Sequence, residues 1–203
     1  TDVTETVTLT IGAIADTTVA ENAVFTGSTP AITGTPIGTL TYTLGGTDAA
    51  DFTINSTTGV ISMVARNFES PADANTDNAY EVTIIATDSD GNTASETQTV
   101  TVTDVTETVT LTIGAIADTT VAENAVFTGS TPAITGTPIG TLTYTLGGTD
   151  AADFTINSTT GVISMVARNF ESPADANTDN AYEVTIIATD SDGNTASETQ
   201  TVT

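Results

Sequence analysis

Apolar and polar residues alternate over short segments of this chain. In residues 80–87, "YEVTIIAT", Tyr80, Val82 and Ile84 fall on one face of an extended strand, and residues 40–44, "LTYTL", alternate apolar residues with threonine. A period of two is typical of a β-strand with one buried face. Because no helical period competes with it, the sequence predicts an all-β protein built from antiparallel strands.

About seven such segments, bounded by Gly, Pro, Asn and Asp turn signals, occur in each half of the chain. In the first half they lie near 5–12, 23–28, 39–44, 52–54, 60–65, 80–87 and 94–103. Residues 33–38, "TGTPIG", and 55–59, "NSTTG", are expected to be turns. Seven short strands in about 100 residues predict a Greek-key, immunoglobulin-like β-sandwich rather than a barrel.

The second half of the chain repeats the first half without a change. Residues 1–101 are identical to residues 103–203. A repeat of about 100 residues is too long for a solenoid unit and has the size of a whole domain. We therefore expect two tandem domains, repeat 1 at residues 1–103 and repeat 2 at 104–203, with a linker around 103–107. Since the chain begins in mid-pattern with "TDVTE", we also expect it to be a fragment of a longer array.

The charge of the chain narrows its possible functions. It contains 26 Asp and Glu residues, two Lys and Arg residues, no His and no Cys, with a formal net charge of −24. Such a polyanion is not expected to bind nucleic acid or an anionic membrane. Without His or Cys, the usual nucleophiles and zinc sites cannot be built. We therefore expect no enzyme, and carboxylate-catalysed glycoside hydrolysis is a distant possibility.

The acidic residues gather in loops that should meet at one end of repeat 1. Antiparallel strands alternate in direction, so every second loop falls at the same end of a sandwich. The predicted cluster comprises Glu21, Asn67, Glu69, Asp73, Asn75 and Asp77 of repeat 1, Asp104, Thr106 and Glu107 of the linker, and Asp190, Asp192 and Asn194 of repeat 2. Clustered carboxylates repel one another, and hard oxygen ligands without imidazole or thiolate favour Ca²⁺.

Five motifs occur in the order typical of one known family. "VAEN", "DFTINSTTGVISM", "RNFE", "YEVTIIATDSDG" and "DVTE" together resemble the cadherin repeat, in the version found in large bacterial surface adhesins. The resemblance covers nearly all of each repeat and implies Ca²⁺ between successive domains. It implies the following ligands: Glu21, Asn67, Glu69, Asp104, Thr106, Glu107 and Asp190.

The chain also departs from the family pattern. Asn67 stands where the family has Asp, Thr106 stands where the linker has Asn, and "TGTPIG" replaces an expected Asp-x-Asp pair. The spacing of Asp73 and Asp77 resembles the opening of an EF-hand loop, which we interpret as a partial calcium loop.

Weaker outer sites are expected at Asp2, Glu5, Asp88, Asp90, Glu123 and Glu171. Four further acids are expected to be ordinary solvated side chains: Asp48, Asp51, Glu81 and Glu96.

The resemblance implies a structural function. The repeats would be calcium-rigidified extender (stalk) units of a secreted bacterial cell-surface adhesin, active in cell adhesion and biofilm formation, and would project a distal binding domain. Their partners would be neighbouring identical repeats of the same chain, with no nucleic acid and no direct membrane insertion. The alternative is a calcium-dependent binding module that self-associates or recognises a carbohydrate.

Overall fold

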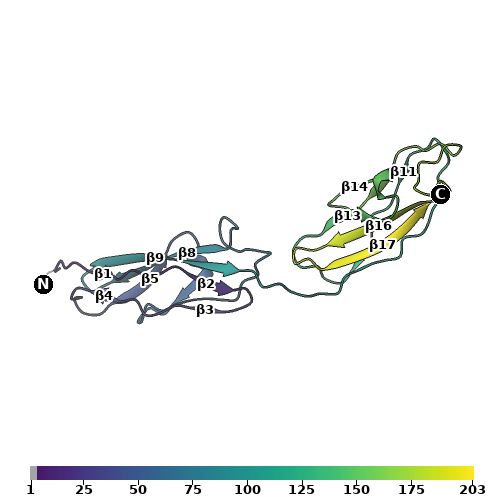
Figure 1. Cartoon of the computed structure of the whole chain (residues 1–203). Helices are drawn as coiled ribbons and strands as arrows, with labels where there is room; N and C mark the ends of the chain where they lie inside the picture. Colours follow the sequence, from purple (N-terminus) through teal and green to yellow (C-terminus); the bar gives the residue numbers. More distant parts are fainter. Residues whose placement is uncertain (1–3) are drawn as a thin grey trace. The chain divides into compact units, whose positions relative to one another are not determined.

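Each repeat folds into its own β-sandwich in the computed structural model, which describes residues 4–203 (Figure 1). The chain divides into two compact units, Thr1–Val105 and Thr106–Thr203. Apart from the short 3₁₀ turns Ala49–Asp51 and Ala151–Asp153, the described residues contain only strands and loops. The predicted all-β sandwich class is confirmed. Within residues 4–203, no helix is long and apolar enough to cross a membrane.

Repeat 1 is built from short strands in three sheets. Its strands are β1 (Thr10–Ile11), β2 (Thr17–Ala20), β3 (Phe25–Thr26), β4 (Ile32–Thr33), β5 (Thr41–Gly45), β6 (Phe52–Ile54), β7 (Ile61–Met63), β8 (Ala79–Thr87) and β9 (Thr93–Thr103). One sheet has the order β2-β9-β8-β5, a second has the order β3-β7-β6, and β1 pairs with β4. All pairs are antiparallel except β2 with β9, which is parallel.

The N-terminal segment contributes to two sheets, which the sequence did not predict. The strand expected at residues 5–12 is limited to β1, and the chain then crosses over to form β2 against β9. Strand β2 was missed because "TTVA" is too short to establish a period of two. Strand β4 was missed because it consists of two residues, the second of which lies in the predicted turn. Both short strands are specified by their pairing partners rather than by their own sequences.

The core lies between the sheets and follows the alternation predicted for β8. Tyr80, Val82, Ile84 and Ala86 are each at most 1% exposed. They belong to one apolar cluster that includes Ile61 and Met63 of β7 and Val100 and Val102 of β9. Full burial of a large apolar side chain contributes roughly 1.5–3 kcal/mol, so these strands form the stable frame that positions the loops.

Repeat 2 has the same architecture, with shorter strand pairing at one end. Its strands are β10 (Thr112–Ile113), β11 (Phe127–Thr128), β12 (Ile134–Thr135), β13 (Thr143–Gly147), β14 (Phe154–Ile156), β15 (Ile163–Met165), β16 (Tyr182–Thr189) and β17 (Thr195–Val202). In place of a strand equivalent to β2, an isolated parallel bridge joins Thr119 to Val202. Strand β2 pairs with β9 as far as Thr103, whereas the described part of repeat 2 extends to Thr203, the copy of Thr101, so this pairing is shorter in repeat 2.

The core pattern predicts that two identical substitutions have unequal effects. Val82→Ala removes two buried methyl groups and should destabilise repeat 1 by about 2 kcal/mol. Val64→Ala makes the same chemical change where the side chain is 62% exposed, and should change stability by less than about 0.5 kcal/mol. Calorimetry of the full chain checks this, because the unchanged repeat 2 serves as an internal reference. Equal effects of the two substitutions would contradict the assigned core face.

Candidate metal centre

Three acidic side chains meet at one end of repeat 1. Glu21 follows β2, Glu69 lies in the loop after β7, and Asp104 follows β9. One carboxylate oxygen from each residue lies within 4.8 Å of the others. Within residues 4–203, this acidic group is the set of acids close enough together to hold one metal ion. Structure and sequence analysis therefore agree that these three of the predicted ligands lie together.

The parallel pairing of β2 with β9 explains how two of these acids become neighbours. The strands are in register with Ala20 opposite Thr103, and the N–H of Glu21 donates to the carbonyl oxygen of Thr103 at 2.9 Å. Parallel strands end on the same side of a sheet, so the next residues, Glu21 and Asp104, leave the sheet side by side. The position of both acids thus follows directly from the strand register.

The carboxylate of Glu21 is fixed by two backbone donors. Its Oε2 accepts a hydrogen bond from the N–H of Phe68 at 3.0 Å, and its Oε1 accepts one from the N–H of Val105 at 2.9 Å. The residue is 4% exposed. A carboxylate has about four lone-pair positions, so these two bonds orient Glu21 and leave further acceptor positions for a cation. Sequence analysis predicted Glu21 as a ligand but not this bridging role.

The positive charges of the chain lie elsewhere. Arg66 binds the carboxylate of Asp51 through Nη2 at 2.7 Å, and Arg168 binds Asp153 at 2.6 Å. The Arg66 guanidinium also lies 5.4 Å from the ring centroid of Tyr80. These are the two basic residues of the sequence. The expectation that Asp51 is merely solvated is wrong, because it neutralises an arginine that would otherwise be half-buried without a counter-ion.

Asp48 is a second acid that was wrongly expected to be solvated. It is 4% exposed, and its carboxylate accepts hydrogen bonds from the N–H groups of Ala74 at 2.9 Å and Glu81 at 2.8 Å. It therefore joins the long loop before β8 to the start of β8 itself. The partners lie 26 and 33 residues away, so no local sequence signal distinguishes Asp48 from a surface acid.

The long loop uses its own acids to maintain its shape. Asp73 is buried and accepts hydrogen bonds from the N–H groups of Asp77 at 2.8 Å and Asn78 at 3.2 Å. Asp77 in turn accepts bonds from the N–H of Ala79 and the amide of Asn75, both at 2.9 Å. These bonds stabilise a tight reversal, and Asp73 and Asp77 do not join the acidic group described above. A calcium role for them stays a prediction.

At the opposite end of repeat 1, Asp88 organises the loop after β8. It is buried and accepts hydrogen bonds from the N–H groups of Ile37, Asp90 and Asn92 at 3.0, 3.1 and 2.9 Å. Burial raises the pKa of the Asp88 carboxyl, but the hydrogen bonds from Ile37, Asn92 and Asp90 together bring the net pKa below its ordinary value. The carboxylate of Asp90 accepts a bond from the N–H of Glu5 at 2.6 Å.

The corresponding loop of repeat 2 holds the beginning of that unit. Asp190 repeats the bonds of Asp88, and its pKa is lowered for the same reasons. Asp192 accepts a hydrogen bond from the N–H of Glu107, and the amide of Asn194 donates to the carbonyl oxygen of Glu107 at 3.0 Å. Glu107 is therefore connected to Asp192 directly and to Asp190 through Asn194, all within repeat 2. The bonds to Glu107 involve its backbone N–H and carbonyl groups.

Other predicted ligands are exposed or lie outside the described residues. Thr106 and Asn67 are exposed, and Oδ1 of Asn67 accepts a hydrogen bond from the N–H of Ser70 at 3.0 Å. Glu123 and Glu171, the copies of Glu21 and Glu69, are exposed in repeat 2 and form no comparable group within residues 4–203. Asp2 lies outside the described residues.

Comparisons with known proteins identify the fold. No family model and no curated protein sequence matches the chain. Among solved structures, the extracellular domain of protocadherin GammaB4 matches with a TM-score of 0.51 and 16% identity, over 97% of this chain and 34% of that one. Drosophila N-cadherin EC1-4 matches with a TM-score of 0.49 and 18% identity, over 96% of this chain and 48% of that one. Mouse cadherin-23 EC22-24 matches with a TM-score of 0.47 and 20% identity, over 94% and 61%.

These matched proteins are longer than the present chain, which spans between about a third and three fifths of their lengths. At such low identity, the likeness establishes the fold alone. The chain consists of two cadherin-like β-sandwich domains in tandem.

Proposed function

We propose that Glu21, Glu69 and Asp104 bind a calcium ion. The observation that carries the proposal is the convergence of three carboxylate oxygens within 4.8 Å, in a chain whose two arginines are bound to other acids. Two charges at this separation repel by about 1 kcal/mol in water and by about 3–4 kcal/mol near a protein surface. A divalent cation removes this cost, and an all-oxygen donor set is the type that Ca²⁺ prefers.

Further oxygen ligands are needed to complete such a site. Ca²⁺ takes about six to eight oxygen atoms, more than three carboxylates supply in monodentate binding. We propose that the linker residues Thr106 and Glu107 contribute, because they follow Asp104 within three positions of the sequence. Other candidates rest on the sequence alone: Asn67, Asp73, Asp77, Asp190 and Asp192, with Asp2, Glu5, Asp88, Asp90, Glu123 and Glu171 as weaker outer sites.

We infer that the repeats act as non-enzymatic spacers in a cell-surface adhesin. Exact repetition of a whole domain adds length, whereas a binding site does not require identical copies. The protocadherin GammaB4 match is an extracellular domain, which supports a location outside the cell. Extracellular calcium modules typically have dissociation constants of about 10⁻⁴–10⁻³ M, so ordinary extracellular calcium would fill this site. The proposed bacterial origin rests on the sequence motifs.

Calcium titration of two matched variants tests the site. Glu21→Gln should weaken the strongest calcium binding of the full chain about tenfold or more, because the charge of the ligands sets the affinity. Glu123→Gln is the same change at the identical residue of repeat 2, which is exposed and outside the acidic group. It should leave the strongest site nearly unchanged. Isothermal calorimetry measures both affinities, and equal effects would refute the assignment to repeat 1.

Removal of calcium should loosen the linker while the sandwiches remain folded. Each sandwich has its own apolar core, so chelation should leave the β-type circular dichroism spectrum intact. At calcium ten times above the dissociation constant, binding adds about 1.4 kcal/mol to the stability of the folded form. Chelation should therefore lower the melting temperature by several degrees, and X-ray scattering should show a wider range of end-to-end distances.

Two outcomes of the chelation experiment would count against the spacer function. Scattering profiles that superimpose with and without calcium would exclude stiffening of the linker. Calcium-dependent dimers detected by sedimentation would instead favour the self-associating module considered from the sequence.

A further inference from the structure

The same aromatic residue takes two different positions in the two identical repeats. In repeat 1, Phe68 is half-buried and packs against the core cluster. In repeat 2, its copy Phe170 is 64% exposed. Because the surrounding sequences are identical, the difference arises from context rather than from the preference of the residue itself.

In repeat 1, a chain of contacts connects Phe68 to the linker. The N–H of Val105 and the N–H of Phe68 donate to the two oxygens of the same carboxylate, that of Glu21. Glu21 is thereby buried, and the loop that carries Phe68 is drawn toward the end of β9. The docked aromatic ring and the first residues of the linker are thus coupled through one side chain.

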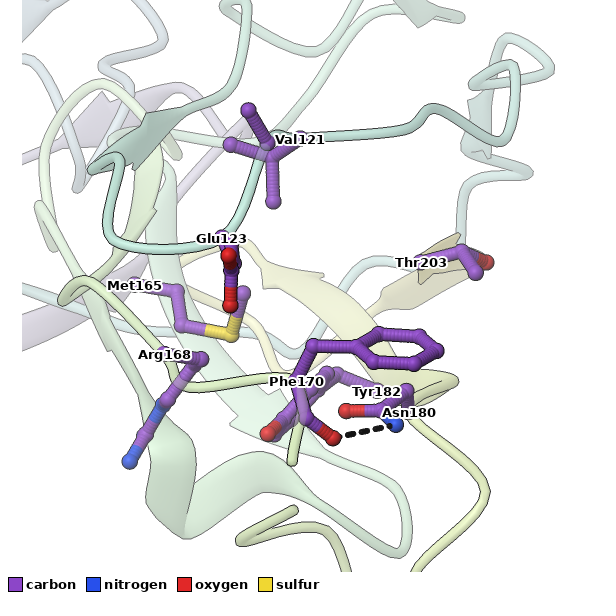
Figure 2. A pocket seen from close by; sticks show the side chains of 9 residues that line it. Val121, Glu123, Met165, Arg168, Phe170, Asn180, Tyr182 and Thr203 are labelled. Carbon is purple, nitrogen blue, oxygen red and sulfur yellow. Dashed lines mark hydrogen bonds between the residues drawn. The ribbon is translucent and has the colours of Figure 1, made fainter. Parts of the chain in front are cut away.

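This arrangement is not formed in repeat 2 within residues 4–203, in which Thr203 is the copy of Thr101 and copies of Val102 and Val105 are not included. Glu123, the copy of Glu21, is exposed. A cavity of about 40 Å³ opens beside it, lined by Val121, Met165, Phe170 and Tyr182 among others (Figure 2). Figure 2 shows that the ring of Phe170 extends away from the side chain of Met165.

One anchor of the loop is the same in both repeats. The amide of Asn78 donates to the carbonyl oxygen of Phe68 at 2.9 Å, and Asn180 donates to that of Phe170 at 3.1 Å. The side chain of the asparagine before the aromatic residue has a different partner in each repeat. Oδ1 of Asn67 accepts from the N–H of Ser70, whereas its copy Asn169 accepts from the N–H of Glu171, one residue earlier in the repeat.

We propose that Phe68 is a latch through which the linker completes the core of the preceding domain. Phe68 docks on the core when the N–H of Val105 holds the Glu21 carboxylate in the position that also binds the N–H of Phe68. In repeat 2, Phe170 would occupy the cavity when Glu123 forms the equivalent pair of bonds. The first linker residues are therefore part of the fold of the domain before them. This coupling uses only protein groups, so it does not depend on the proposed calcium site.

Fluorine NMR of the full chain tests the latch directly. The sequence has six phenylalanines, so labelling with 4-fluorophenylalanine gives six signals, which Phe68→Leu and Phe170→Leu assign. With chelator present, a soluble paramagnetic probe should broaden the Phe170 signal several-fold more than the Phe68 signal. Equal broadening of the two signals would overturn the proposal at once.

Two variants then test the cause in opposite directions. Val105→Pro removes the backbone donor and should raise the broadening of the Phe68 signal to that of Phe170, whereas Val105→Ala keeps the donor and should not. Thr203 is the copy of Thr101, so adding Val-Thr-Asp-Val-Thr-Glu after it supplies the copies of residues 102–107, including the missing donor, and should protect Phe170. Adding Val-Thr alone supplies the copies of Val102 and Thr103 without the donor and should not protect it. The longer extension needs no destabilising substitution, so an unchanged Phe170 signal in the chain that carries it would refute the latch even if the proline variant misfolds. A failed calcium titration would leave these results unaffected.

Discussion

The structure at the end of repeat 1 depends on how the repulsion among three clustered carboxylates is compensated. Strand register brings Glu21 and Asp104 out of the sheet side by side, and Glu69 is added by the loop after β7. The chain has two arginines, and each is bound to an aspartate outside this group. The protein therefore compensates the charge of Glu21 partly through backbone N–H groups, and we infer that a cation supplies the rest.

Glu21 links the proposed calcium site to the apolar core. Each oxygen of its carboxylate accepts one backbone hydrogen bond, from Phe68 or Val105, and one of these oxygens lies within 4.8 Å of carboxylate oxygens of Glu69 and Asp104. A ligand held in this way loses little conformational entropy when it binds a metal. The same contacts place Phe68 on the core, so the linker, the acidic group and the sandwich form one connected structure in repeat 1.

Patterns within single segments were sufficient to predict the long strands, and the alternation of loop ends together with the order of the family motifs predicted the acidic group. β8 alternates over nine residues, and the acids of the group lie in motifs with a recognisable order. Contacts between distant segments could not be predicted in this way. Strand β2 depends on β9, and Asp48 is buried by partners far along the chain. The contrast between Phe68 and Phe170 is the clearest case, since the residues around them are identical in the two repeats and the burial of the ring differs.

A crystal structure of the chain grown with calcium, with anomalous scattering used to locate the ions, tests the calcium site most directly. We expect an anomalous peak about 2.3–2.6 Å from one carboxylate oxygen each of Glu21, Glu69 and Asp104, the usual range for calcium. A map without a peak at these three residues, or with calcium bound only in the loop of Asp73 and Asp77, would contradict the proposed site.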